Sequence, residues 1–189
     1  MLDDDHSLVL RVARGDEAAF AGLLGRHGPV MVRLAYRMLG DRAEAEDVAQ
    51  EAFLRLWRKA PTWRDGPSGP GGWLQRVTMN LCLDRLRRRR FVVDGAAPEQ
   101  VDPAASTIDQ QSLIEARAQV AAAVGGLPAR QRAALVLCYY EERSNAEAAA
   151  ILGMSVSAVE SLLARARRAL RSILRAQGLE TRDVMEAQP

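Results

Sequence analysis

The side chains whose spacing suggests chemistry begin on one helical stretch, DRAEAEDVAQEAFLRLW, which spans Asp41–Trp57. Its apolar residues recur at the i, i+3, i+4 and i+7 positions that form the buried face of an amphipathic helix. The other face would present two carboxylates, an amide and a leucine, which are Asp47, Gln50, Glu51 and Leu54. Such a face suits binding to another protein, although acids on an exposed helix are more often only solvated.

A second stretch, Ser144–Arg168, has the spacing of a helix-turn-helix. Ser144 and Glu147 have the separation of a capping box. Either Ser155 or Ser157 would cap the second helix. Three positions fit the junction of the two helices. Ala149 is a small residue where the helices meet, Gly153 is a glycine at the turn, and Val159 would pack the second helix against the first. The outer side would carry a polar stripe suited to DNA, formed by Ser161, Arg165, Arg168 and Arg175. An ordinary helical hairpin is the alternative.

A third stretch, Trp73–Arg90, is predicted to be a helix with two apolar patches and a polar seam between them. The first patch comprises Trp73, Leu74, Val77 and Leu81, the second Met79, Leu83 and Leu86, and the seam Arg76, Asn80, Asp84 and Arg87. The seam is either structural, with Asp84 pairing an arginine, or a DNA surface, because asparagine can donate to and accept from a base. Pro61–Gly72 is predicted to be a loop, and its Trp63 and Arg64 could join that surface.

These elements indicate an all-α fold of two small helical domains. Aromatic residues make up only 5% of the chain, which favours helices packed through leucine, valine and alanine. The first domain would span residues 1–90. Its first long helix would be capped by Asp16 and end at Gly28, and a separate helix would begin at Pro29 and run to Gly40.

The rest of the chain divides by composition. Residues 91–106 contain two prolines and no periodicity, so they are predicted to be a flexible linker that reaches roughly 50 Å when extended. Residues 107–176 would form the second domain, and the polar residues 177–189 a frayed tail.

Several classes of protein are disfavoured. Cys82 and Cys138 lie far apart inside apolar patterns, which predicts buried thiols and no disulfide. The chain shows no nucleophile–base pairing, no phosphate-binding glycine loop and no metal-ligand spacing, which argues against a helical enzyme and against any cofactor or metal. The acidic N-terminus is not a signal peptide, and no apolar run has membrane-spanning length. A cytoplasmic protein with no membrane insertion is expected.

Taken in order, these motifs resemble those of the sigma-70 family of bacterial transcription initiation factors, and most closely its two-domain extracytoplasmic-function (ECF) group. AEDVAQEAFLRLW resembles the core-polymerase-binding segment and WLQRVTMNLCLDRLRRRR the promoter-melting helix. LPARQRAALVLCYYEERSNAEAAAILGMSVSAVESLLARAR resembles the domain that binds the upstream promoter element. The resemblance extends from about Leu8 to Leu174.

The resemblance implies a specificity subunit that is not itself an enzyme. Its partners would be the largest and second-largest subunits of core RNA polymerase, promoter DNA and an anti-sigma factor. The alternative is a stand-alone helix-turn-helix regulator. That alternative does not explain the acidic helix face, the loop or the polar seam.

The resemblance also implies roles for individual residues. Asp47, Gln50, Glu51 and Leu54 would contact the clamp helices of the largest subunit. Asn80 and the Pro61–Gly72 loop would hold a base flipped from the downstream (minus-ten) element. Ser155–Arg168 would enter the major groove of the upstream (minus-thirty-five) element, and an apolar surface at Leu127–Leu137 would sit on the polymerase flap. The DNA-binding candidates together are Trp63, Arg64, Arg76, Asn80, Arg85, Arg88, Arg89, Ser155, Ser157, Ser161, Arg165 and Arg168. Glu160 and Leu162 depart from the basic residues usual in that helix, which suggests an unusual promoter sequence.

Overall fold

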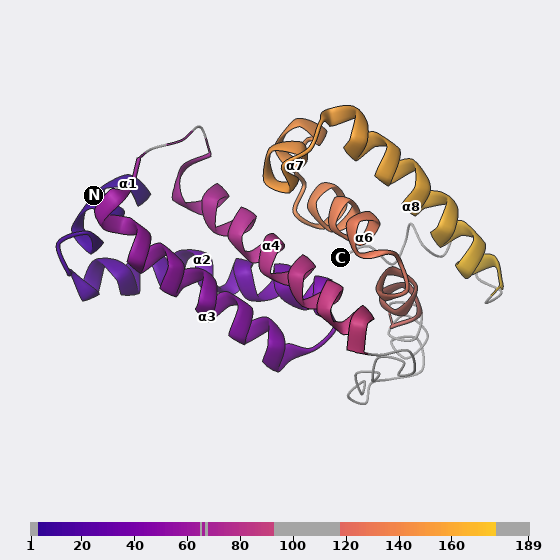
Figure 1. Cartoon of the computed structure of the whole chain (residues 1–189), viewed down its shortest axis with the longest axis horizontal. Helices are drawn as coiled ribbons and strands as arrows, with labels where there is room; N and C mark the ends of the chain where they lie inside the picture. Colours follow the sequence, from indigo (N-terminus) through magenta and orange to yellow (C-terminus); the bar gives the residue numbers. More distant parts are fainter. Residues whose placement is uncertain (1–3, 65, 67, 93–117, 177–189) are drawn as a thin grey trace, which may run out of the picture.

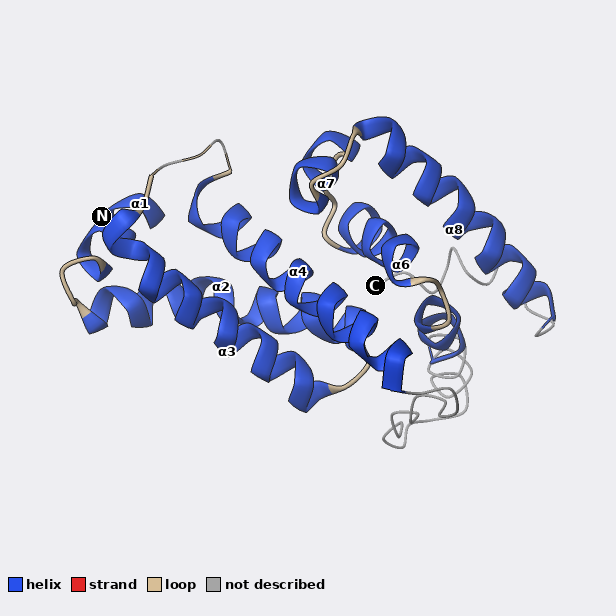
Figure 2. Cartoon of the chain, viewed as in Figure 1, coloured by secondary structure: helices blue, strands red, loops and turns tan. Residues whose placement is uncertain are grey.

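The computed structural model describes residues 4–64, 66, 68–92 and 118–176. Within these ranges every regular element is helical, so the predicted all-α fold is confirmed (Figures 1 and 2). The helices form two bundles that lie side by side, one from each half of the chain (Figure 1). The tail and nearly all of the predicted linker fall outside the described residues, and residues 91 and 92 continue a helix.

The first bundle contains four α-helices and one short 3-10 turn. They are α1 (Asp5–Val12), α2 (Glu17–Leu39), α3 (Arg42–Lys59), η1 (Ala60–Thr62) and α4 (Gly69–Val92). Asp16 caps α2 by accepting a hydrogen bond of 3.0 Å from the Ala19 amide. Gly40 ends α2 with a φ of 74°, a left-handed conformation that favours glycine. The predicted cap at Asp16 and the predicted end at Gly40 are therefore confirmed.

The predicted break before Pro29 is wrong, because α2 continues through this residue. Proline removes one backbone hydrogen bond from a helix and costs about 3 kcal/mol or more. The buried stripe nevertheless continues across it, with Leu23 before the proline and Met31 and Leu34 after it essentially inaccessible to solvent. Each such side chain contributes about 1.5–3 kcal/mol on burial, so packing outweighs the local penalty.

The start of α4 also differs from the prediction. The helix begins at Gly69 rather than Trp73, and η1 occupies the first residues of the predicted loop. Proline is tolerated in a first helical turn because its missing amide hydrogen would have no partner there, and Pro70 occupies this position. The Gly72 amide donates to the Ser68 carbonyl at 3.1 Å and closes the turn.

The second bundle begins with the helical residues 118–125. It continues with α6 (Ala129–Leu135), the π-helical turn η2 (Val136–Tyr140), α7 (Asn145–Leu152) and α8 (Val156–Ala176). As predicted, α8 buries Val159, Leu163 and Ala166. Leu170 and Ile173 were also expected to be buried, but they are half-buried and Leu174 is buried instead. The long α8 extends beyond the shorter α6 and α7 (Figure 1).

A single apolar cluster connects the two bundles. It contains Met38 from α2 and Met79 from α4 together with Ala134, Leu137 and Ile151 from the second bundle. α4 packs against both α6 and α7, and α2 contacts α6 and η2. No sequence pattern indicates this contact, because these members from the two bundles are separated by 55 residues or more and share no periodicity.

Candidate functional site

The two faces of α3 are as the sequence predicts. Asp41 caps the helix by accepting a hydrogen bond of 2.9 Å from the Glu44 amide. The packed face is buried and consists of Ala45, Val48, Ala49, Ala52, Phe53 and Leu56. On the opposite side Asp47 and Gln50 are exposed, and Leu54 retains 48% of its accessible surface. A leucine this open on a well-packed helix is available to a partner.

A groove runs between this face of α3 and the neighbouring α4. It is lined by Asp47, Gln50, Glu51, Leu54, Arg55, Leu81, Asp84, Arg85 and Arg88. The structure therefore brings together all four predicted polymerase-binding residues and two of the predicted DNA-binding arginines. Two of the three acids come from α3 and two of the three arginines from α4, so the groove offers both signs to a partner.

Glu51 is held in its charged form. The Arg55 guanidinium donates to its carboxylate at 2.8 Å, one helical turn away. This hydrogen bond is the main reason that the pKa of Glu51 lies below its usual value. Glu51 is therefore ionised at neutral pH.

The two apolar patches of α4 pack in opposite directions. Leu74 and its neighbours join the core of the first bundle, whereas Met79, Leu83 and Leu86 join the cluster shared with the second bundle. All four residues of the seam, Arg76, Asn80, Asp84 and Arg87, are exposed. Asp84 and Arg87 form an ion pair of 3.1 Å, so part of the seam has the structural role considered from the sequence.

Two of the terminal arginines of α4 are engaged inside the protein. Arg85 donates to the Glu44 carbonyl oxygen at 2.9 Å. Arg89 donates to the Leu39 carbonyl at 3.4 Å and pairs with the Glu44 carboxylate at 2.5 Å. The Glu44 side chain therefore binds Arg89, while its amide donates to the capping residue Asp41. Arg88, by contrast, is exposed.

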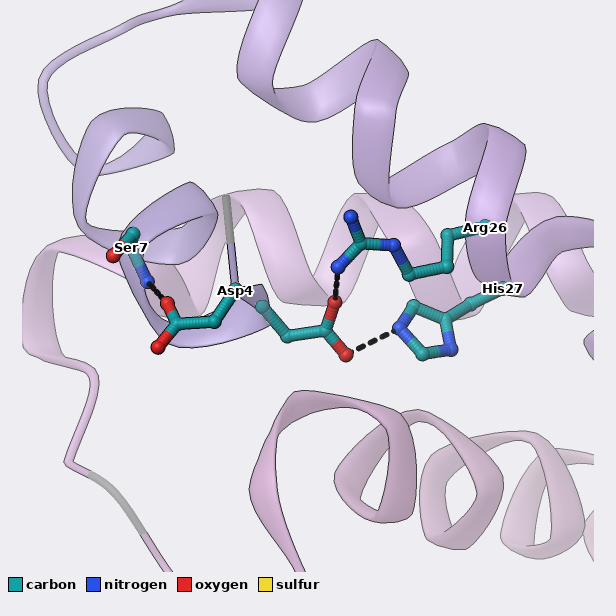
Figure 3. Close-up of polar contacts among 5 residues, drawn as sticks. Asp4, Ser7, Arg26 and His27 are labelled. Carbon is teal, nitrogen blue, oxygen red and sulfur yellow. Dashed lines mark hydrogen bonds and ion pairs between the residues drawn. The ribbon is translucent and has the colours of Figure 1, made fainter. Parts of the chain in front are cut away.

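A polar network joins α1 to α2 near the start of α4 (Figure 3). His27 Nε2 lies 2.7 Å from Asp5 Oδ2, and Arg26 pairs with the other oxygen of the same carboxylate. The His27 ring also fills the space beside Gly71, where an added Cβ would lie only 2.9 Å from Cε1. His27 was not singled out from the sequence, and the adjacent glycines of the loop are the only local signal of this close approach.

Aromatic packing holds the other end of the loop. The rings of Trp63 and Trp73 meet edge to face with their centroids 5.8 Å apart. Trp63 is half-buried in this contact, whereas Arg64 is exposed. Of the two loop residues predicted to face DNA, Arg64 is thus the more accessible.

The helix-turn-helix forms as predicted. Ser144 accepts from the Glu147 amide at 3.2 Å, and the Glu147 carboxylate accepts from the Ser144 amide at 2.9 Å. The Ser144 hydroxyl also donates to the Glu147 carboxylate at 2.7 Å, and this bond, with the one from the Ser144 amide, lowers the pKa of Glu147. Gly153 has a φ of 64°, Ala149 is buried and Val159 is fully buried. The axes of α7 and α8 are bent by 102°, within the range of about 90–120° of helix-turn-helix units.

The second helix presents its candidate residues outward. The Ser155 hydroxyl accepts from the Ala158 amide at 3.3 Å, so Ser155 is the cap and Ser157 lies beside it. Five candidates are exposed, namely Ser155, Ser157, Ser161, Arg165 and Arg168. α8 forms the outer edge of the second bundle, away from the first (Figure 1).

Two expectations about apolar residues need correction. Leu127, Leu135 and Leu137 are buried, so this segment forms core and not the apolar surface expected there. Its helix α6 packs on α8 and on the first bundle, which leaves little apolar surface free.

Cys138 is half-buried rather than buried. Cys82 is buried as expected, and desolvation raises the pKa of its thiol to about 12.

Comparison with known proteins identifies the family. The model of sigma-70 region 2 matches residues 23–92, and that of sigma-70 region 4 matches residues 117–170. The ECF RNA polymerase sigma factor SigL of Mycobacterium tuberculosis is 35% identical over 172 residues, which cover 90% of this chain and 97% of SigL. The chain is a sigma factor of the ECF group.

Other relatives agree with this assignment. SigE of Mycolicibacterium smegmatis, also an ECF RNA polymerase sigma factor, is 39% identical over 176 residues, covering 89% of this chain and 68% of SigE. The structure of CnrH in complex with the cytosolic domain of CnrY superposes with a TM-score of 0.67 at 31% identity, covering 92% of this chain and 99% of CnrH. The sigma factor role is thus supported over a stand-alone regulator.

In the described part of the chain no single helix is long and apolar enough to cross a membrane, and only the bent pair α7 and α8 passes when taken together. Among the same residues no group of three or more histidine, cysteine, aspartate or glutamate side chains could hold a metal ion.

Proposed function

We propose that this sigma factor binds core RNA polymerase through the α3 groove and directs it to promoters. The observation that carries the proposal is the exposed row of Asp47, Gln50 and Leu54 on a helix whose other face is fully packed. These side chains contribute little to the fold, so their arrangement suits a partner. The clamp helices of the largest polymerase subunit would occupy the groove, and the second domain would reach the flap of the second-largest subunit.

Two separate surfaces would read the promoter. Asn80 and Arg76 on the exposed seam of α4, with Arg64 from the loop, would hold an unpaired base of the minus-ten element. The exposed side of α8 would enter the major groove at the minus-thirty-five element, with Arg165 and Arg168 toward base edges and phosphates. The hydroxyls of Ser155 and Ser157 stand at the helix N-terminus, which attracts phosphate.

The unusual residues of α8 have different roles. Leu162 is half-buried against the cluster that joins the bundles, so it belongs to the protein interior. Glu160 is exposed near the N-terminal end of the helix. A carboxylate there can accept from the amino group of cytosine and repels phosphate, so Glu160 would select bases and not add affinity.

The protein itself would have no catalytic activity and need no cofactor, because the polymerase supplies the chemistry. It would act in the cytoplasm, where its polymerase and promoters are. CnrH was solved with the cytosolic domain of a second protein, CnrY. A comparable protein partner, an anti-sigma factor, would control this chain.

The test is transcription by the purified chain with core polymerase on a pool of genomic fragments. New discrete transcripts that core polymerase alone does not produce would support the proposal. Replacing Asp47 and Gln50 with alanine should weaken polymerase binding at least tenfold. Glu46→Ala is the matched control, because Glu46 is also an acid on α3 but does not line the groove. Equal binding by the double variant would place the polymerase surface elsewhere.

A further inference from the structure

The short helix α1 packs on both sides of the loop that connects η1 to α4. It contacts η1 before the loop and α4 after it. Its buried residues Leu8, Val9 and Val12 lie in the same apolar cluster as Ala60 from η1 and Leu74 from α4. Because α1 is anchored in this core, it is placed to hold both ends of the loop.

The first turn of α4 requires glycine at three positions, each for a different reason. Gly69 has a φ of 57°, a conformation that favours glycine. A Cβ on Gly72 would collide with the Ser68 side chain, which belongs to the same turn. A Cβ on Gly71 would lie 2.9 Å from His27 Cε1, which belongs to α2. The shape of this turn therefore depends on a side chain from another helix.

The His27 ring is in turn held by α1. Its Nε2 lies 2.7 Å from Asp5 Oδ2, and the Arg26 guanidinium pairs with the other oxygen of that carboxylate. Arg26 and His27 are neighbours on α2, and both side chains point toward the start of α1 (Figure 3). Only 17% of the His27 side chain is exposed. A polar chain thus runs from Asp5 through His27 to Gly71 and joins α1 to the start of α4.

The side chains proposed to read the minus-ten element are joined to this turn. Trp73 follows it directly, and its ring meets that of Trp63 with the centroids 5.8 Å apart. Arg64 comes next after Trp63 and is exposed, as is Asn80 further along α4. A base held between Arg64 and Asn80 needs both at a set separation, and a misplacement of about 1 Å costs on the order of a hundredfold in a positioned reaction. The first turn of α4 would therefore set the geometry of the proposed base-binding site.

We propose that His27 is a positioning residue for reading of the minus-ten element. Asp5 fixes the His27 ring, the ring fixes the first turn of α4, and this turn determines where the loop presents Arg64. His27 itself would not touch DNA, because its ring is enclosed between Asp5 and Gly71. The role in promoter reading rests on the proposed function, whereas the link from α1 to α4 does not.

The first experiment measures amide hydrogen exchange in the free full-length protein. The reporters are the amides of Gly69 and Gly72, which donate to the carbonyls of Gly66 and Ser68 and close the turn. Asp5→Ala removes the partner of His27 and should speed exchange at both reporters by about three- to tenfold, because the turn opens more often.

Two further variants separate this link from a general change in α1. Asp4→Asn is the matched control, because Asp4 caps α1 by accepting from the Ser7 amide at 2.7 Å and asparagine keeps such a cap. It should change exchange by less than about twofold. His27→Phe keeps a ring beside Gly71 but loses the bond to Asp5, so it should act like Asp5→Ala. The double variant should exchange no faster than either single variant, because both changes break the same chain of contacts.

The second experiment measures which bases the holoenzyme accepts. The probe is a promoter recovered from the genomic fragment pool, with its minus-ten positions randomised, and sequencing of the transcripts gives the relative use of each base. Asp5→Ala and His27→Phe should reduce the preference for the favoured base by about three- to tenfold, with polymerase binding changed by less than about twofold. A role in stability alone would lower transcription from every template by the same factor.

Each outcome bears on a different step of the proposal. Unchanged exchange at Gly69 and Gly72 in Asp5→Ala, or additive effects in the double variant, would overturn the link from α1 to α4. Faster exchange with an unaltered base preference would overturn the positioning role of His27. Failure of the natural protein to produce transcripts would overturn the proposed function and leave the exchange result intact.

Discussion

The two candidate DNA surfaces of this sigma factor differ in how firmly their neighbours hold them. On α4, Arg85 and Arg89 bind backbone carbonyls of α2 and α3, and Gly71 at the base of the loop sits against His27. On α8, Arg168 is exposed, and Arg165 is exposed and donates to the Ser161 carbonyl of its own helix. The difference indicates that arginine content alone is a poor guide to a DNA surface. The candidate surface on α4 is fixed by contacts within the protein, whereas the one on α8 has exposed side chains.

The largest effect is expected at Gly71, near the start of α4, which lies close to the His27 ring. Gly71→Ala should lower the free energy of unfolding by about 1–3 kcal/mol, because the new Cβ would press on the His27 ring. Urea denaturation measures this loss. Adding His27→Ala to Gly71→Ala should recover part of the stability by making room. If Gly71→Ala alone is neutral, the loop base is looser than its packing indicates.

A smaller loss is expected from an arginine of α4. Arg89→Ala should lower the free energy of unfolding by roughly 1–2 kcal/mol, because it removes an ion pair to Glu44 and a bond to a helix-end carbonyl. Arg168→Ala on α8 is the control and should change stability by less than about 0.5 kcal/mol. Equal losses for the two variants would contradict the contrast between the surfaces.

The smallest effect concerns DNA and not folding. Arg165→Ala should leave unfolding unchanged but weaken binding of the holoenzyme to promoter DNA by about fivefold. It should also reduce the slope of log affinity against log salt by about one, because one phosphate contact is lost. Affinity measured over a range of salt concentrations gives both quantities. An unaltered slope would move the phosphate contact away from Arg165.

Local periodicity was sufficient to predict the elements that rest on it. The buried face of α3, the two patches of α4 and the positions of Ala149, Gly153 and Val159 each depend on residues within a few turns of one another. Such spacings translate directly into a face or a turn. The resemblance to sigma factors followed from the same segments.

Features that depend on distant partners could not be predicted in this way. Pro29 continues a helix because α3 and α4 cover both halves of α2. Arg89 binds a carbonyl 50 residues earlier in the chain, and the bond from Arg37 to Glu141 spans 104 residues. A single sequence gives no signal for such pairings, because the partner residues are ordinary in their own surroundings.

The short helix α7 has a consequence for how the second domain melts. It has only eight residues, whereas an isolated helix of fewer than about 12–15 residues is marginal in water. Its persistence comes from the capping box, from α8 and from the side of α4 that it covers. α7 therefore lacks the means to unfold and refold by itself, and its amide protons should exchange together with those of α8. The helix that orients α8 therefore belongs to a larger cooperative unit that unfolds or stays folded as a whole.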